Sequence, residues 1–239
     1  MASSRMFLFG GSKAWNPADW TSSDDRVRGG SSQPTQSYLT CTGSSPTARF
    51  HGTLDIKTLG GAGFASQRTT GEDRSWDLSA YDGIELDVED ADSKRYTFIL
   101  KDELLPKNPE NGREQSTISY EYDFQVQKDE DSQSSSSKGT KIVMPWDALK
   151  ATYRGKEKRD AAPLDTKNIK RLSVMMRSFF GDQEGDFALS IRSIAAVKIP
   201  KPEERSYPVG VTLSEKGMLP LWWRDSRRRE QGVSPVLKL

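Results

Sequence analysis

The sequence IELDVE at residues 84–89 decides the fold class, because apolar and acidic residues alternate in it without exception. Successive side chains of a β-strand point to opposite faces, so this pattern predicts a strand with one buried and one solvated face. The same alternation recurs elsewhere, over residues 50–56, 95–100, 118–124, 142–144, 172–176 and 187–191. The sequence therefore predicts an all-β protein.

Strands this numerous, with turn residues between them and little helical periodicity, favour an antiparallel two-sheet sandwich of jelly-roll type. Helix is expected only as one or two short turns, over residues 146–151 after Pro145 and within residues 163–169. We expect the jelly-roll domain to span residues 15–199, between an N-terminal segment (1–14) and a C-terminal tail (200–239).

A serine-rich run interrupts the pattern: residues 129–139 read DEDSQSSSSKG. Such a composition cannot bury apolar surface. We predict a disordered insertion over residues 129–138, between two strands of the domain.

Charge and cysteine content exclude several classes of partner. The chain has 239 residues with 35 basic and 34 acidic side chains, so no global field attracts nucleic acid. A single cysteine, Cys41, excludes an intramolecular disulfide and fits a reducing compartment. The apolar run at residues 6–9 is too short for a signal peptide or a membrane anchor, and no clear transit peptide is visible.

Two polar segments contain paired glycines: WTSSDDRVRGGSS at residues 20–32 and GGAGFASQR at residues 60–68. This composition is typical of tight turns whose amides and side chains face a shared polar surface. The candidate binding residues here are Asp24, Asp25, Arg26 and Arg68, and the candidate turn glycines are Gly29, Gly30, Gly61 and Gly63. We expect one of the aspartates to pair with Arg26 or Arg68.

Catalytic chemistry has little support in these residues. Adjacent carboxylates such as Asp24 and Asp25 cannot flank one scissile bond, and the glycines at 60–63 are not followed by the helix of a phosphate-binding loop. The only histidine, His51, would give zinc just two of its four ligands together with Cys41. We therefore predict a protein that is not an enzyme, with no catalytic residue, cofactor or metal site, although the acidic residues at 87–92 leave calcium binding open.

The tail contains Trp222 and Trp223, followed by Arg224 and a run of arginines at 227–229. Tryptophans offer a large apolar area, and the arginines can engage carboxylates or anionic headgroups. We expect these residues to contact a partner protein or a membrane. The alternative is that the two tryptophans pack back on the sandwich.

The order of these motifs resembles the complex I intermediate-associated protein 30 family. That family has a tryptophan, then S-D-D-x-x-x-G-G-S, then G-G-x-G-F-A-S-x-R, which match Trp20, residues 23–31 and residues 60–68 here. Further matches include Met144-Pro145-Trp146, and the likeness extends over about residues 15–199. An acidic loop at residues 89–95 departs from the family's glycine-rich turn.

This resemblance implies a galactose-binding-like jelly roll that serves as a non-enzymatic assembly factor for mitochondrial respiratory complex I (NADH:ubiquinone oxidoreductase). Its implied partners are complex I subunits of the membrane arm and other assembly factors, on the matrix side of the inner membrane, with peripheral contact with that membrane. A cytoplasmic location is the alternative, since a clear transit peptide is missing. A carbohydrate-binding module or a general protein-interaction module of the same fold also stays open.

Overall fold

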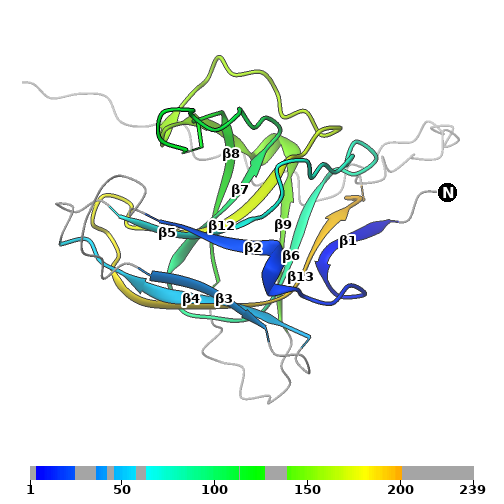
Figure 1. Cartoon of the computed structure of the whole chain (residues 1–239). Helices are drawn as coiled ribbons and strands as arrows, with labels where there is room; N and C mark the ends of the chain where they lie inside the picture. Colours follow the sequence, from blue (N-terminus) through cyan, green and yellow to red (C-terminus); the bar gives the residue numbers. More distant parts are fainter. Residues whose placement is uncertain are drawn as a thin grey trace, which may run out of the picture. The chain divides into compact units, whose positions relative to one another are not determined.

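Two antiparallel β-sheets, packed face to face, form the fold of the described residues (Figure 1). The computed structural model describes residues 4–24, 36–41, 46–57, 63–112, 114–126 and 139–200. The chain divides into two units, Met1–Pro200 and Lys201–Leu239, and the second unit lies outside the described residues. The predicted insertion at 129–138 also lies outside them.

The first sheet has the strand order β3-β4-β13-β6-β9, with β1 also paired to β13. Its strands are β1 (Arg5–Gly10), β3 (Gln36–Cys41), β4 (Ala48–Leu54), β6 (Gly83–Ala91), β9 (Thr140–Pro145) and β13 (Gly185–Val197). The predicted strand IELDVE lies within β6, where Ile84, Leu86 and Val88 are almost completely buried.

The second sheet has the order β11-β10-β8-β7-β12-β5-β2. Its strands are β2 (Trp20–Asp24), β5 (Phe64–Thr69), β7 (Arg95–Lys101), β8 (Ser119–Gln125), β10 (Lys150–Tyr153), β11 (Lys156–Glu157) and β12 (Arg171–Arg177). The predicted all-β, two-sheet architecture is confirmed.

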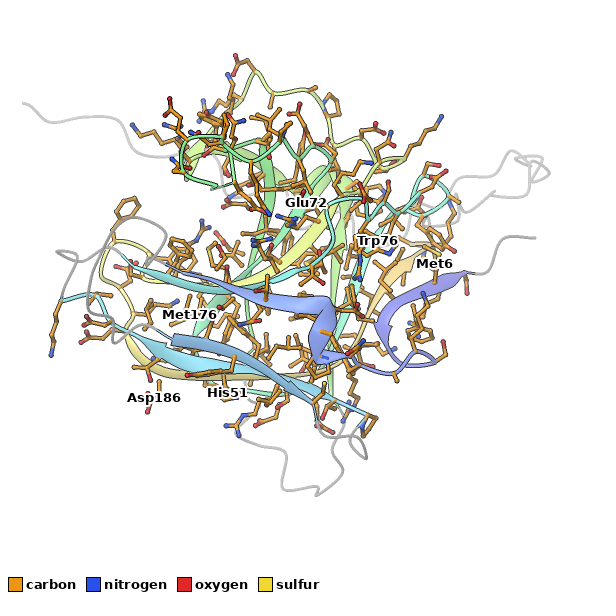
Figure 2. The ribbon with its side chains drawn as sticks, in the orientation of Figure 1. Met6, His51, Glu72, Trp76, Met176 and Asp186 are labelled. Carbon is orange, nitrogen blue, oxygen red and sulfur yellow. The ribbon has the colours of Figure 1, made fainter. Side chains whose placement is uncertain are left out.

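Aromatic rings join the two sheets in the core. Phe50 of β4 lies 5.0 Å from Phe187 of β13 and 6.2 Å from Tyr96 of β7, measured between ring centroids. Met176 of β12 is also fully buried between the layers (Figure 2). Burial of such apolar area is the main stabilising term of a sandwich.

Strand β13 carries an irregularity that changes which residues face the core. Phe187, Leu189 and Ile191 are core residues at odd positions, but the next core residues are Ile194 and Ala196. The register with β6 shifts on both sides of Ile191, which is the signature of a β-bulge. One additional residue in the bulge reverses the alternation, and the strand then continues in the same sheet.

The N-terminal boundary expected at residue 15 is too late. Arg5–Gly10 forms β1, which pairs with the end of β13 from Arg5↔Val197 to Gly10↔Ser193. Leu8 and Phe9 are buried, and the Phe9 ring lies 4.9 Å from that of Trp20. The short apolar run that seemed too small for a membrane anchor is thus a core strand.

The expected helical turns are reduced to single 3-10 turns in the described residues. One turn spans Trp146–Ala148 after Pro145, but residues 150–153 form β10 instead of prolonging it. Another spans Pro17–Asp19, capped by the Asn16 side chain. Residues 163–169 contain no helix, and Ile169 pairs with Trp76 through two backbone hydrogen bonds of 2.9 and 3.1 Å.

A cavity in the core should destabilise the fold strongly. We expect Leu86→Ala to lower the free energy of unfolding by about 2–5 kcal/mol, because Leu86 is fully buried on the inner face of β6. Val143→Ala on the neighbouring β9 is the control, since Val143 is 39% exposed and should change stability by no more than about 0.5 kcal/mol. Urea denaturation measures both; equal effects would contradict the assigned core.

Candidate functional site

The two glycine-bearing segments are neighbouring strands in the second sheet. Residues 20–24 form β2 and residues 64–69 form β5, paired from Trp20↔Thr69 to Asp24↔Ala65. The expectation of tight turns is therefore wrong for these parts of the segments, because their hydroxyl and small residues lie in extended backbone. The described parts of the two segments are nevertheless neighbours in the sheet.

The predicted site residues are only partly described. Arg68 on β5 forms an ion pair of 2.9 Å with Glu114, and the carbonyl of Gly63 accepts a 2.9 Å hydrogen bond from the Ser178 amide. Asp24 is described by its backbone alone. Outside the described residues lie Asp25, Arg26, Gly29, Gly30, Gly61, Trp222 and Trp223, so the roles assigned to them stay predictions.

The surface of the second sheet that points away from the sandwich core, here called the outer face, carries many charged side chains. Because Leu172, Val174 and Met176 face the core, the alternate residues of β12 face outward. The strand register extends this face to the neighbouring strands. It consists of Arg68 of β5, Arg171, Ser173 and Arg177 of β12, Thr97, Ile99 and Lys101 of β7, and Glu121 and Asp123 of β8.

The middle of the outer face is a network of ion pairs and hydrogen bonds. Arg177 donates to Glu121 at 2.8 Å and to Asp123 at 2.6 Å. The same carboxylates accept hydrogen bonds from the hydroxyls of Thr152 (2.7 Å) and Thr97 (2.6 Å). Two acids thus share one guanidinium, and the nearly buried Glu121 has its charge compensated.

At one end of the outer face, cations outnumber carboxylates. Lys101 and Arg171 lie directly opposite each other on β7 and β12, and Arg68 lies on the next strand, opposite Ser173. The carboxylate of Glu114, from the loop between β7 and β8, contacts both Arg68 and Arg171. The Lys101 ammonium donates to the Thr117 hydroxyl at 2.9 Å.

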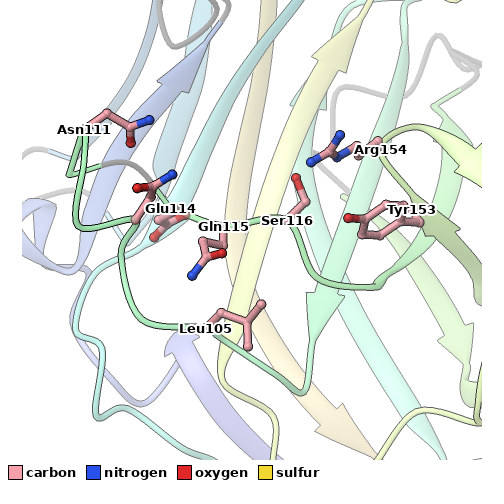
Figure 3. A pocket seen from close by; sticks show the side chains of 8 residues that line it. Leu105, Asn111, Glu114, Gln115, Ser116, Tyr153 and Arg154 are labelled. Carbon is pink, nitrogen blue, oxygen red and sulfur yellow. The ribbon is translucent and has the colours of Figure 1, made fainter.

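A hollow of about 310 Å³ lies beside this cation-rich end (Figure 3). Its lining comes from the same loop and from the turn between β10 and β11: Leu105, Asn108, Asn111, Glu114, Gln115, Ser116, Tyr153 and Arg154. Arg154 adopts a left-handed backbone with φ of 51°, a conformation that side-chain-bearing residues rarely adopt. The hollow offers amide, hydroxyl and guanidinium groups, suited to a polar ligand.

A second hollow, of about 390 Å³, separates the edge strands β2 and β3. Trp20, Ser37, Tyr38 and Gln67 are among its lining residues. Gln67 donates to the Ser37 carbonyl at 2.9 Å and so ties the two sheets together beneath it. His51 stacks on Tyr38 with ring centroids 5.5 Å apart, and burial, followed by Arg49, lowers the pKa of this histidine.

The turn between β12 and β13 presents an exposed aromatic side chain. Phe179 and Phe180 both have positive φ, 47° and 65°, and the Phe180 side chain is 97% exposed. The Phe179 ring lies beneath two guanidinium groups, 3.5 Å from Arg95 and 4.6 Å from Arg177. Gln183 fixes the turn by donating to the Arg95 and Arg177 carbonyls, both at 2.7 Å.

Sequence reasoning missed the residues that dominate this surface: Lys101, Glu114, Arg171, Arg177, Phe179 and Phe180. A usable signal existed for the strand residues, because Arg171 and Arg177 have the opposite parity to the buried Leu172, Val174 and Met176. Glu114 lies in an irregular loop, where periodicity gives no direction for a side chain.

Within the described residues, no group of three or more histidine, cysteine, aspartate or glutamate side chains is placed to hold a metal ion. In the acidic stretch considered for calcium, Asp92 accepts hydrogen bonds from the Tyr96 hydroxyl and the Ala188 amide, at 2.9 and 2.8 Å. Burial and this carboxylate raise the pKa of Tyr96. Asp87 and Glu89 instead form ion pairs with Arg192.

The described strands thus define an antiparallel two-sheet sandwich of jelly-roll type whose outer face is polar. The sequence profile of the family described as complex I intermediate-associated protein 30 matches residues 7–191, and the chain belongs to this family. It is also 43% identical over 192 residues to the uncharacterized protein C9E9.15 of Schizosaccharomyces pombe, which covers 80% of this chain and 84% of the relative.

A solved structure agrees with the fold. The family 11 carbohydrate-binding module of the cellulosomal cellulase Lic26A-Cel5E of Clostridium thermocellum superposes with a TM-score of 0.52 at 12% sequence identity. The match covers 85% of this chain and 99% of the module.

No helix among the residues described here is long and apolar enough to cross a membrane.

Removal of Arg177 should leave Glu121 and Asp123 without the counter-charge that they share. We expect Arg177→Met to lower the free energy of unfolding by about 1–3 kcal/mol, because the nearly buried Glu121 would lose its counter-charge. Arg159→Met is the matched control, since Arg159 pairs with Glu157 on an exposed hairpin. Urea denaturation at constant ionic strength measures both; an unchanged Arg177→Met stability would contradict the network.

Proposed function

We propose that this protein is a non-enzymatic assembly factor for mitochondrial respiratory complex I. The observation that carries the proposal is membership of the complex I intermediate-associated protein 30 family over residues 7–191, a range that includes strands of both sheets. In this role the protein holds immature membrane-arm subunits on the matrix side of the inner membrane until the arm is built.

A rigid sandwich suits such a role, because it can shield a client's unburied surface without any chemical step. The turn at Phe179–Phe180 is the described feature best suited to client contact. The Phe180 ring is almost fully exposed, and Gln183 fixes the backbone of the turn. Little conformational entropy is therefore lost when a partner covers this ring. We assign the client contact to this turn, together with the tail residues Trp222 and Trp223.

Carbohydrate binding is the rival function, and it rests on fold similarity alone. The charged groups in the middle of the outer face are engaged with one another through Arg177, Glu121 and Asp123. A sugar bound there would have to replace these charge-assisted hydrogen bonds. Binding to a glycan array that persists at physiological salt would favour the rival.

Deletion of the gene tests the cellular role. We expect less assembled complex I on native gels and lower NADH-linked respiration, with succinate-linked respiration largely intact. Imaging of a tagged copy that restores the deletion strain should place it in mitochondria. Normal complex I in the deletion strain, or a cytoplasmic tagged protein that still restores it, would contradict the proposal.

The exposed ring can be removed without damage to the fold. Phe180→Gly relieves a left-handed backbone strain of about 1–2 kcal/mol, which offsets the roughly 0.5–1 kcal/mol that glycine costs in chain entropy. We therefore expect the melting temperature to change little, while recovery of complex I subunits with the tagged protein falls.

Tyr153→Ser is the matched control, because Tyr153 is another exposed aromatic residue, on the β10–β11 hairpin. Its recovery of subunits should equal that of the unchanged protein. Equal recovery by the Phe180→Gly variant would show that this turn is not the client contact.

A further inference from the structure

The cation-rich end of the outer face has an electrostatic cost that the fold does not remove. Lys101 and Arg171 are direct cross-strand partners, and like charges at such positions repel each other. Arg68 adds a third cation from the next strand. Arg171 is only 3% exposed, so water screens this repulsion poorly.

Among the described residues, the counter-charge in direct contact with this cluster is a single carboxylate. Glu114 contacts Arg68 and Arg171, whereas Lys101 has the neutral Thr117 hydroxyl as its hydrogen-bond partner. Three cations and one carboxylate leave an excess of two positive charges.

Other acids near the cluster are already engaged. Glu72 forms an ion pair of 2.7 Å with Lys107, and Glu121 pairs with Arg177. Burial lowers the pKa of the Lys101 ammonium, and the neighbouring Arg171 and Arg68 lower it further, although Glu114 and, more weakly, Glu121 act in the opposite direction. The same cause, burial, lowers the pKa of Arg68.

Hydrogen-bonding capacity is also left unused. The Nε atoms of Arg68 and Arg171 are buried and have no hydrogen-bond partner. A buried N–H without an acceptor costs free energy, and a guanidinium matches an oxyanion by donating through two nitrogens at once. The cluster thus lacks both negative charge and acceptor oxygens.

The access route passes Glu114. Its side chain is 38% exposed, it belongs to the loop that covers this end of the sheet, and it also lines the hollow of about 310 Å³ (Figure 3). Rotation of this one side chain towards the hollow would open Arg68 and Arg171 to a small anion. Arg154 stands across the same hollow as a further cation.

We propose that Arg68, Lys101 and Arg171 form a binding site for a phosphate group, and that the Glu114 carboxylate occupies this site when no phosphate is bound. A phosphate monoester carries about −1.5 to −2 charges at pH 7, so it offsets more of the three cations than the single charge of Glu114 does, and its oxygens can accept from all three side chains. The source is either a soluble phosphate compound or a lipid headgroup, which share this chemistry.

The test uses the full chain and inorganic phosphate as the probe. Phosphate binding is measured by calorimetry and by the rise in melting temperature, with sodium chloride adjusted to keep ionic strength constant. We expect Lys101→Met to weaken binding about tenfold, the effect of one charge-assisted hydrogen bond. Lys198→Met is the matched control, because Lys198 pairs with Asp82 at the end of the first sheet and should leave binding unchanged.

Glu114→Gln provides the decisive variant, since it removes the competing carboxylate and should tighten phosphate binding several-fold. If this variant is unstable alone, phosphate should restore its melting temperature. Sedimentation with phosphatidylcholine vesicles, with and without phosphatidic acid, assigns the source: selective binding to the acidic vesicles identifies a lipid headgroup.

Three results would overturn the proposal. The first is stabilisation by phosphate no greater than by chloride at equal ionic strength, with no selective binding to acidic vesicles. The second is a Lys101→Met variant that binds like the unchanged protein. The third is a Glu114→Gln variant that binds no tighter and is not restored by phosphate.

Discussion

The antiparallel pairing along β13 is the constraint on which the first sheet depends. One edge of this strand pairs with β6, and the other edge is shared by β4 and then β1. The bulge near Ile191 lies where the partner on this edge changes from β4 to β1. Beyond the bulge, the core-facing side chains are those of Ile194 and Ala196. The aromatic contacts to Tyr96 then hold the second sheet against the first.

The second sheet is built differently on its two faces. Its inner face supplies apolar residues to the core, whereas its outer face is charged from Arg68 to Asp123. In the middle of that face Glu121 and Asp123 share Arg177, and cations prevail at the end covered by Glu114. The two proposed roles fall on separate parts of this sheet: client contact at the Phe180 turn and anion binding at the opposite end of β12.

Sequence periodicity predicted the half-buried strands well, because alternation such as that of residues 84–89 has one physical cause, the pleat of the strand. It missed β1, β2, β3, β5, β10 and β11, which are short or have few or consecutive apolar residues. For the site it identified Arg68, but not Glu114 or Arg171, since contacts between a loop and two strands depend on tertiary packing. Asp24, Asp25 and the glycines at 29 and 30 stay predictions.

The pairing of β1 with the end of β13 determines when this protein can finish folding during its synthesis. Arg5 pairs with Val197, so β1 has no partner strand until the chain has been made as far as β13. Closing so long a loop is slow, and until then the apolar side chains of Leu8 and Phe9 are exposed. A chain without residues 5–10 would leave the edge of β13 from Ser193 to Val197 unpaired, and an unpaired strand edge is a template on which another strand can add.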